Sequence, residues 1–387
     1  SLKILGVFFD STGPTPANWS SALQELCANC EAASAFNLTY LERAYLVRSV
    51  FCGRVWHLSH VLIAPRSVVS RIHTTILAFI WQKRRNRPVA RIFLSLPVFR
   101  GGLALPDVGL MNRGIALKTV LRIICGEPSP TQVLLMYWMG PLVRTLSPES
   151  FAPSRPAARS PRRFHAVIHA YHRMLARITP PVNPNSTSPA HMSQAVLWDE
   201  ACSSTIWAHR RRQVDTIAWS RVVCSWLPPS LFDTLWSFAW SIQPTRDRLH
   251  VWNITPTNIC PYCASVETNC HVLFECRIAR IFWQLVRRHT NIMCPIPLDR
   301  RCASQRYSVL VTACGAQVLW GARCKAVAQR RRDVPIFLLV RSLRVRVVSV
   351  LQRELFALGE DGFVRCWGHH PSVRAVGGLV TIAGVPS

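Results

Sequence analysis

The chain has 387 residues, 49% of them hydrophobic, so it is long enough for about two or three domains with buried cores and is not a disordered tail. Lys and Arg number 46 against 19 Asp and Glu, a net charge of +27, and only four of the basic residues are lysine. This excess attracts polyanions, and the planar guanidinium of arginine suits phosphates. Nucleic acid is therefore the first partner to expect, ahead of a membrane surface.

The sequence shows no pattern typical of secretion or membrane insertion. SLKILGVFFD at the start has neither a basic leader nor a small-residue cleavage site. The longest weakly charged apolar run, 222–242, contains Pro228, Pro229 and Asp233, which argues against a spanning helix. We expect a protein of the nucleus or cytoplasm that makes no membrane contact. In such a reducing compartment, fifteen cysteines indicate buried thiols and a metal site.

The first 80 residues predict a strand followed by helices. Residues 2–9 alternate loosely and lead into a turn near 11–16, so a strand is expected there. Cys27 and Cys30 lie in a helical pattern and are interpreted as buried thiols. Thr39 and Glu42 have capping-box spacing, and the helix that they open has an apolar face formed by Leu41, Tyr45, Cys52, Val55 and Trp56. A second amphipathic helix, from Ser67, has an apolar face formed by Val68, Ile72, Ile76, Phe79 and Ile80.

A basic loop at 81–91 and a third helix follow. The stretch FLSLPVF, 93–99, is expected to be extended, and Asp107 is predicted to be the N-cap of a helix that ends near Ile124. Residues 147–195, rich in Pro, Ser and Arg, predict a flexible connection around one helix, on which His165, His169 and His172 are interpreted as part of a solvated basic face.

The C-terminal half contains a Trp-rich segment and two basic helices. Seven tryptophans lie between 196 and 252 (198, 207, 219, 226, 236, 240 and 252), and their roughly helical spacing favours a hydrophobic core over base stacking. Residues 306–358 predict two long basic helices interrupted near Asp333–Pro335. The last twenty residues are expected to form a poorly ordered tail.

The segment CPYCASVETNCHVLFEC, 260–276, has the ligand types and spacing of a zinc site. Cys260 and Cys263 form a Cys-x2-Cys turn, and His271 and Cys276 follow one helical turn apart. Zinc in structural sites takes four such ligands in a tetrahedron, and a set of four protein ligands has no open position for catalysis. The pattern therefore favours structural Zn²⁺ over ordinary buried cysteines. Cys270 could replace His271, but the spacing from His271 to Cys276 is the recurring one.

The region around this motif resembles the zinc-binding region downstream of the reverse transcriptase in LINE-type non-LTR retrotransposons. That family has a Trp, Pro-Thr-Arg-Asp-x-Leu, Cys-Pro-x-Cys, Glu-Thr-x-x-His, Cys and a further Trp in this order. The matching residues here are Trp240, Pro244, Thr245, Arg246, Asp247, Leu249, Cys260, Pro261, Cys263, Glu267, Thr268, His271, Cys276 and Trp283.

A second resemblance covers most of residues 1–124. KILGVFFD at 3–10, NLTYLERAYLVRSVFCGRVWHLSHVL at 37–62, FIWQKRR at 79–85 and LPVFRGGLALPDVGLMNRGIALKTVLRII at 96–124 are similar to the sequence after the palm in the same polyproteins. The family's polymerase centre holds Mg²⁺ on an Asp-Asp turn, and no Asp-Asp pair occurs in this sequence. Mg²⁺ is thus expected only in a polymerase domain outside this chain, and the family resemblance leaves enzymatic activity of this chain uncertain.

Together these observations predict a mainly α-helical protein in four parts. The resemblance assigns 1–146 to the end of the reverse transcriptase palm and a thumb-like helical domain that follows a short strand. Residues 147–195 would connect it to a Trp-rich helical region with the zinc knuckle, 196–292, and to a basic C-terminal region, 293–387.

The resemblance implies that the chain positions element RNA and target DNA for target-primed reverse transcription. The expected nucleic-acid contacts are Lys83, Arg84, Arg85, Arg87, Arg91, Arg113, Lys118, Arg122, Arg246, Arg277 and Arg280. Three alternatives remain open: an active RNA-directed DNA polymerase if a palm precedes Ser1, an inert genomic relic, and a zinc-stabilised protein-interaction module.

Overall fold

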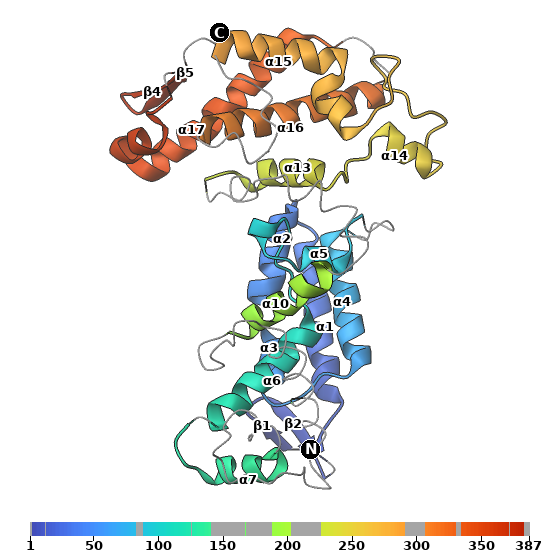
Figure 1. The fold of residues 1–387 in the computed structure, drawn as a ribbon, viewed down its shortest axis with the longest axis vertical. Helices are drawn as coiled ribbons and strands as arrows, with labels where there is room; N and C mark the ends of the chain where they lie inside the picture. The colour runs from blue at the N-terminus through green and yellow to red at the C-terminus, as the bar shows by residue number, and fades with distance from the viewer. Residues whose placement is uncertain are drawn as a thin grey trace. The chain divides into compact units, whose positions relative to one another are not determined.

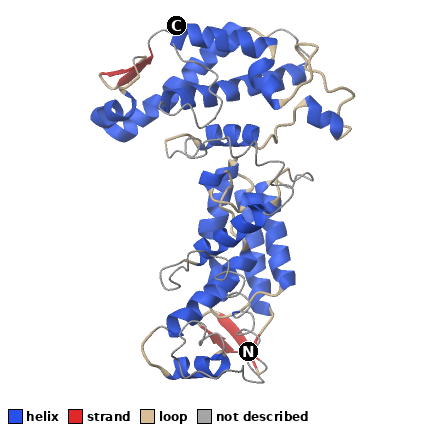
Figure 2. Ribbon diagram, in the orientation of Figure 1, coloured by secondary structure: helices blue, strands red, loops and turns tan. Residues whose placement is uncertain are grey.

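The chain is mainly helical, as predicted, with short strands near both ends. The structure, a computed structural model, describes residues 2–11, 13–82, 88–124, 126–140, 167, 188–202, 226–290, 306–329, 334–370 and 372–382. The polypeptide divides into two units, Ser1–Ala208 and His209–Ser387 (Figures 1 and 2).

The N-terminal unit begins with a small antiparallel sheet. Strands β1 (Leu2–Ile4), β2 (Val7–Asp10) and β3 (Gly13–Pro14) pair in the order β1-β2-β3. The strand predicted at 2–9 is present but divided into two, because the chain reverses at Leu5 and Gly6, which have φ angles of 47° and 81°. Buried Asn18 in α1 (Ala17–Ala33) fixes the sheet to the helices: its side chain accepts the N–H of Phe8 and donates to the Phe8 carbonyl, both at 2.8 Å.

The other elements that the structure describes in this unit are helical. They are α2 (Tyr40–Leu46), the π-helical turn η1 (Val47–Phe51), α3 (Gly53–Ser59), α4 (Arg66–Ile80), α5 (Arg91–Leu94), the 3-10 turn η2 (Val98–Arg100), α6 (Val108–Ile124), α7 (Pro130–Trp138) and α10 (Pro189–Cys202). The predicted extended stretch at 93–99 was wrong, because its two ends lie in α5 and η2.

Two predictions of helix starts are confirmed. Thr39 and Glu42 form a complete capping box at α2. Asp107 caps α6, since its Oδ1 accepts the N–H of Leu110 at 3.0 Å.

The prediction of one continuous apolar face on the helix that begins after Thr39 is partly wrong. Tyr45 is 57% exposed, whereas Cys52 and Val55 are buried. The π-helical turn η1 contains an extra residue per turn and rotates the faces of α2 and α3 relative to each other. In the helix expected from Ser67, now α4, the predicted face is buried at Ile72, Ile76, Phe79 and Ile80, and Val68 is partly exposed.

The helical elements that the structure describes in the C-terminal unit are α13 (Pro229–Ala239), α14 (Arg246–Val251), the π-helical turn η3 (His271–Glu275), α15 (Arg277–Thr290), α16 (Arg306–Gln329) and α17 (Ile336–Trp367). The two long helices expected in 306–358 are present as α16 and α17, although α17 continues beyond a kink at Gly359. The tail prediction was wrong for residues 373–382, which form an antiparallel hairpin of β4 (Val373–Val376) and β5 (Leu379–Ile382).

A tryptophan from α15 packs directly on α16. Buried Trp283 donates its indole N–H to the Leu273 carbonyl at 2.7 Å, so the ring position is fixed. A Cβ atom added at Gly315 would lie 2.2 Å from Cη2 of this ring. Glycine is therefore required at this helix crossing.

Gly315→Ala is expected to lower the free energy of unfolding by about 1–3 kcal/mol, because the ring or α16 must shift. Gly321→Ala, in the same helix and with no atom within 4 Å of the added Cβ, is the matched control and should stabilise by up to about 1 kcal/mol. Urea denaturation of both variants measures the difference. Equal stability of the two would contradict the packing argument.

Candidate metal centre

Two of the predicted ligands lie in a knuckle-shaped turn. Ile259 and Val266 form an antiparallel bridge, and the Cys260 N–H donates to the Ser265 carbonyl at 2.9 Å, which closes the turn. The N–H of Tyr262 points at the Cys260 sulfur, 3.4 Å away. This backbone arrangement presents Cys260 and Cys263 on the same side, as a Cys-x2-Cys ligand pair requires.

The other two ligands flank the π-helical turn η3. His271 begins it, and the His271 N–H donates to the Thr268 hydroxyl at 3.1 Å. Cys276 follows it, and its N–H donates to the His271 carbonyl at 2.8 Å. In a regular α-helix, residues five apart are separated by about 140° around the axis, whereas the wider π turn places them over each other. The His-x4-Cys spacing thus produces a converging pair.

The four side chains converge on one point. One ligand atom from each of Cys260, Cys263, His271 and Cys276 lies within 4.8 Å of all the others. The Cys260 and Cys276 sulfurs are 3.9 Å apart, and the Cys263 sulfur is 3.2 Å from Nε2 of His271. Zinc–sulfur bonds of about 2.3 Å in a tetrahedron place sulfurs about 3.8 Å apart. The donor set and its spacing therefore fit Zn²⁺.

The sulfurs also influence each other's protonation. The hydrogen bond between Cys260 and Cys276 lowers the pKa of the Cys276 thiol and, together with burial, raises that of Cys260. The lowered pKa of Cys276 makes the thiolate, the form that binds metal, easier to reach at this sulfur than at an isolated thiol. Cys270, the alternative to His271, is exposed and is not in the cluster.

A buried ion pair connects the knuckle to α16. Glu267 is fully buried, and its Oε1 accepts from Arg323 at 3.1 Å (Nε) and 2.6 Å (Nη2) and from the backbone N–H of Arg246 at 2.9 Å. The Tyr262 hydroxyl adds a contact to α16 by donating to the Ala322 carbonyl at 3.2 Å. The sequence indicated Glu267 only through the family pattern. It gave no signal for Arg323, because that residue is 56 positions away.

The Pro-Thr-Arg-Asp residues support the same turn. Arg246 donates from its guanidinium to the Ile259 carbonyl at 3.1 Å, and the Thr245 hydroxyl bonds to Asp247 at the start of α14. The structure therefore places Arg246, an expected nucleic-acid contact, against the backbone of the knuckle. Arg277 and Arg280 are exposed on the first turn of α15, directly after Cys276.

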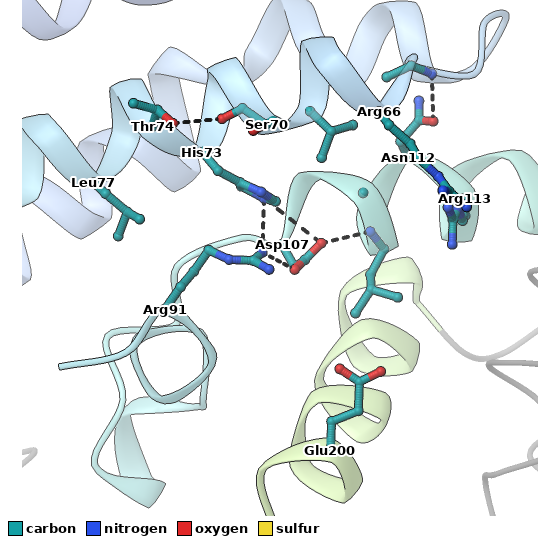
Figure 3. Close-up of a pocket in the computed structure, with 14 residues that line it drawn as sticks. Arg66, Ser70, His73, Thr74, Leu77, Arg91, Asp107, Asn112, Arg113 and Glu200 are labelled. Atoms are coloured by element: carbon teal, nitrogen blue, oxygen red, sulfur yellow. Dashed lines mark hydrogen bonds and ion pairs between the residues drawn. The ribbon is translucent and has the colours of Figure 1, made fainter. Parts of the chain in front are cut away.

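The other basic residues predicted to contact nucleic acid lie in the N-terminal unit. Lys83, Arg84, Arg85 and Arg87 fall outside the described residues. Arg91 and Arg113 line the same cavity, although they are far apart in the sequence (Figure 3). Lys118 and Arg122 lie on α6 and do not line it.

Of the tryptophans, Trp226, Trp236 and Trp240 are buried, which confirms the core interpretation for them. Trp252 is partly exposed and lies under the Arg248 guanidinium, 4.9 Å from the ring centre. Trp207, Trp219 and the side chain of Trp198 fall outside the described residues, as do His165, His169 and His172.

The interpretation of the N-terminal cysteine pair is half right. Cys30 is buried, and burial raises its pKa to about 12, but Cys27 is exposed.

Comparison with protein families supports a reverse-transcriptase-related zinc-binding region. Residues 202–283 match the family described as zinc-binding in reverse transcriptase, a match that ends at Trp283 and contains all four clustered ligands. No curated protein matches the chain significantly. Across the part of the chain that the structure describes, no helix is both long and apolar enough to cross a membrane.

Proposed function

We propose that the chain is the C-terminal part of a LINE-type retrotransposon reverse transcriptase that holds element RNA and target DNA during target-primed reverse transcription. The observation that carries the proposal is the convergence of three cysteines and one histidine within the segment that matches the reverse-transcriptase zinc-binding family. In this proposal Zn²⁺ is structural: it fixes the knuckle, and through it the start of α15. The net charge of +27 supplies attraction for the phosphate backbone.

The domain assignments follow from the same proposal. Residues 1–146 act as the end of the palm and a thumb, 147–195 as the connection, 196–292 as the zinc-binding region and 293–387 as a basic helical region. The chain works in the nucleus or cytoplasm. Catalysis, with its Mg²⁺, belongs to a polymerase domain outside this chain.

The nucleic-acid surface beside the zinc site is proposed to include Arg277 and Arg280. Both are exposed, and α15 holds them next to Cys276. A guanidinium that contacts a phosphate releases a condensed counterion, so its loss reduces the salt dependence of binding.

The test is salt-dependent binding of the purified full chain to a labelled 20-nucleotide RNA, the same DNA strand and a DNA duplex. Arg277→Gln/Arg280→Gln should keep its zinc and reduce the slope of log affinity against log salt by about 1.4–1.8. The control Lys325→Gln/Arg341→Gln removes the same charge from exposed positions of α16 and α17 and should change it less. Binding that is absent or insensitive to salt would overturn the proposal and favour a protein-interaction module.

A further inference from the structure

The C-terminal hairpin exposes an apolar pair of residues beside a tight turn (Figure 1). Gly377 and Gly378 join β4 to β5, and their φ angles of 59° and 76° are typical of a two-residue type I′ turn. Val376 and Leu379 flank this turn, pair across the strands and are 69% and 65% exposed. Because side chains alternate along a strand, the opposite face of the hairpin packs inward. Its buried residues are Val373, Val380 and Ile382.

One edge of the hairpin, along β5, is already covered. The Gln352 side chain of α17 donates to the Gly378 carbonyl at 2.7 Å and accepts the Val380 N–H at 3.0 Å. This carboxamide therefore bonds to the backbone of β5 in the place where a third strand would bond. A further strand cannot use these backbone groups of β5.

The other edge, along β4, is open. The two residues that close a two-residue turn bond to each other, so the backbone groups of the next pair, Ala375 and Val380, point away from the partner strand. The bond from Val380 to Gln352 agrees with this direction. Within the described part of the chain, no residue bonds to the N–H or the carbonyl of Ala375. Outward N–H and carbonyl groups of this kind are a template for pairing with another strand.

The two ends of β4 have opposite charge. Arg374 is exposed and lies on the same face of the strand as Val376. At the turn, Glu360 of α17 accepts the Gly378 N–H at 3.0 Å, which holds a carboxylate there. Residues 354–364 contain three acidic residues and no Lys or Arg, in a chain with a net charge of +27. Antiparallel pairing of two β4 strands would thus match the basic end of each with the acidic end of the other, whereas the net charge opposes most other contacts between two copies.

We propose that two copies of the chain form a dimer in which β4 of one copy pairs antiparallel with β4 of the other, about a two-fold axis at Ala375. The Ala375 N–H of each copy then donates to the Ala375 carbonyl of the other, and the two hairpins form one four-stranded sheet. Arg374 lies opposite the partner's Val376, so its aliphatic stem covers the exposed apolar pair and its guanidinium approaches the acidic end. Both copies use the same surface, so the assembly closes at two. The inference goes beyond the proposed function, because the contact is between proteins and needs no nucleic acid.

The experiment is sedimentation velocity of the full chain, purified with zinc, treated with nuclease and kept reduced. Small interfaces are weak, so concentrations from about 5 to 100 µM are compared, and the wild type should change from monomer to dimer in this range. Proline is tolerated on edge strands, and Ala375→Pro removes only the outward N–H, so the bonds within the hairpin remain. This variant should dimerise about tenfold more weakly or worse, because two hydrogen bonds between the copies are lost.

A charge exchange tests the register of the two strands. Val376→Arg places like charges opposite each other twice in the dimer and should weaken dimerisation about tenfold. Adding Arg374→Glu to this variant should restore dimerisation to within about threefold of the wild type, because opposite charges then face each other. Val345→Arg is the matched control. Val345 is 62% exposed on α17, outside the hairpin, so its replacement adds the same charge and should leave dimerisation unchanged.

Several results would overturn the dimer. A wild-type chain that stays monomeric, or one that forms assemblies larger than two, contradicts a closed two-fold contact. A dimer that Ala375→Pro leaves unchanged contradicts pairing along β4, and a charge exchange without recovery, or equal weakening by Val345→Arg, contradicts the register. Equal thermal unfolding midpoints check that the variants are folded. Since no nucleic acid is present, these results leave the proposed function untouched.

Discussion

Replacing Cys276 by serine is expected to remove stoichiometric zinc from the purified chain and to unfold the knuckle. The four ligands come from two short segments connected by a loop, and the adjoining core of Phe238, Leu273 and Ala316 is small. Apparent binding free energies of structural zinc are about 10–16 kcal/mol, which is as large as the stability of a whole domain. Metal analysis should give one zinc per wild-type chain and none in the variant. Limited proteolysis should then cut the variant within 240–283.

Cys270→Ser is the matched control for this variant. Cys270 lies six residues before Cys276 in the same segment, but its side chain is exposed and outside the cluster. It should retain one zinc per chain and the protease resistance of the wild type. Loss of zinc from the Cys270 variant, or its retention in the Cys276 variant, would contradict the ligand assignment.

The features that were predicted from the sequence are those that depend on neighbours along the chain. The zinc ligands fall within seventeen positions, and the Thr39 capping box spans four, so spacing alone identifies them. The buried face of α4 follows in the same way from helical periodicity.

Features that depend on distant residues or on irregular backbone were not predicted. The π-helical turn η1 changed which side of α2 and α3 is buried, and periodicity assumes a regular helix. Asn112 on α6 bonds to Ala64 and Leu62 in the segment before α4, and spacing does not reveal contacts between residues 48 and 50 positions apart. The terminal hairpin has weak local signals and depends on contacts with α17, including the bond from the Val380 N–H to Gln352 at 3.0 Å.

The contact between the knuckle and α16 joins a local metal motif to a helix that lies later in the sequence. Zinc can fix the geometry of its own four ligands, but it does not fix the orientation of the knuckle relative to α16. Arg323 of α16 fixes that orientation, because its guanidinium bonds to Glu267, which lies in the sequence between the two ligand pairs. The same guanidinium lies against the Trp320 ring, 4.9 Å from its centre, and so joins the ion pair to the core around Phe238.

Arg323→Met is expected to lower the free energy of unfolding of the C-terminal unit by about 3–5 kcal/mol, because it leaves the Glu267 carboxylate buried without its counter-charge. Glu267→Gln/Arg323→Met should recover most of this loss. The glutamine amide oxygen can still accept the Arg246 N–H, and methionine fills much of the arginine's volume. Urea denaturation with saturating zinc measures both variants. If the double variant were as unstable as the single one, packing by the arginine, rather than its charge, would be what holds the zinc knuckle against α16.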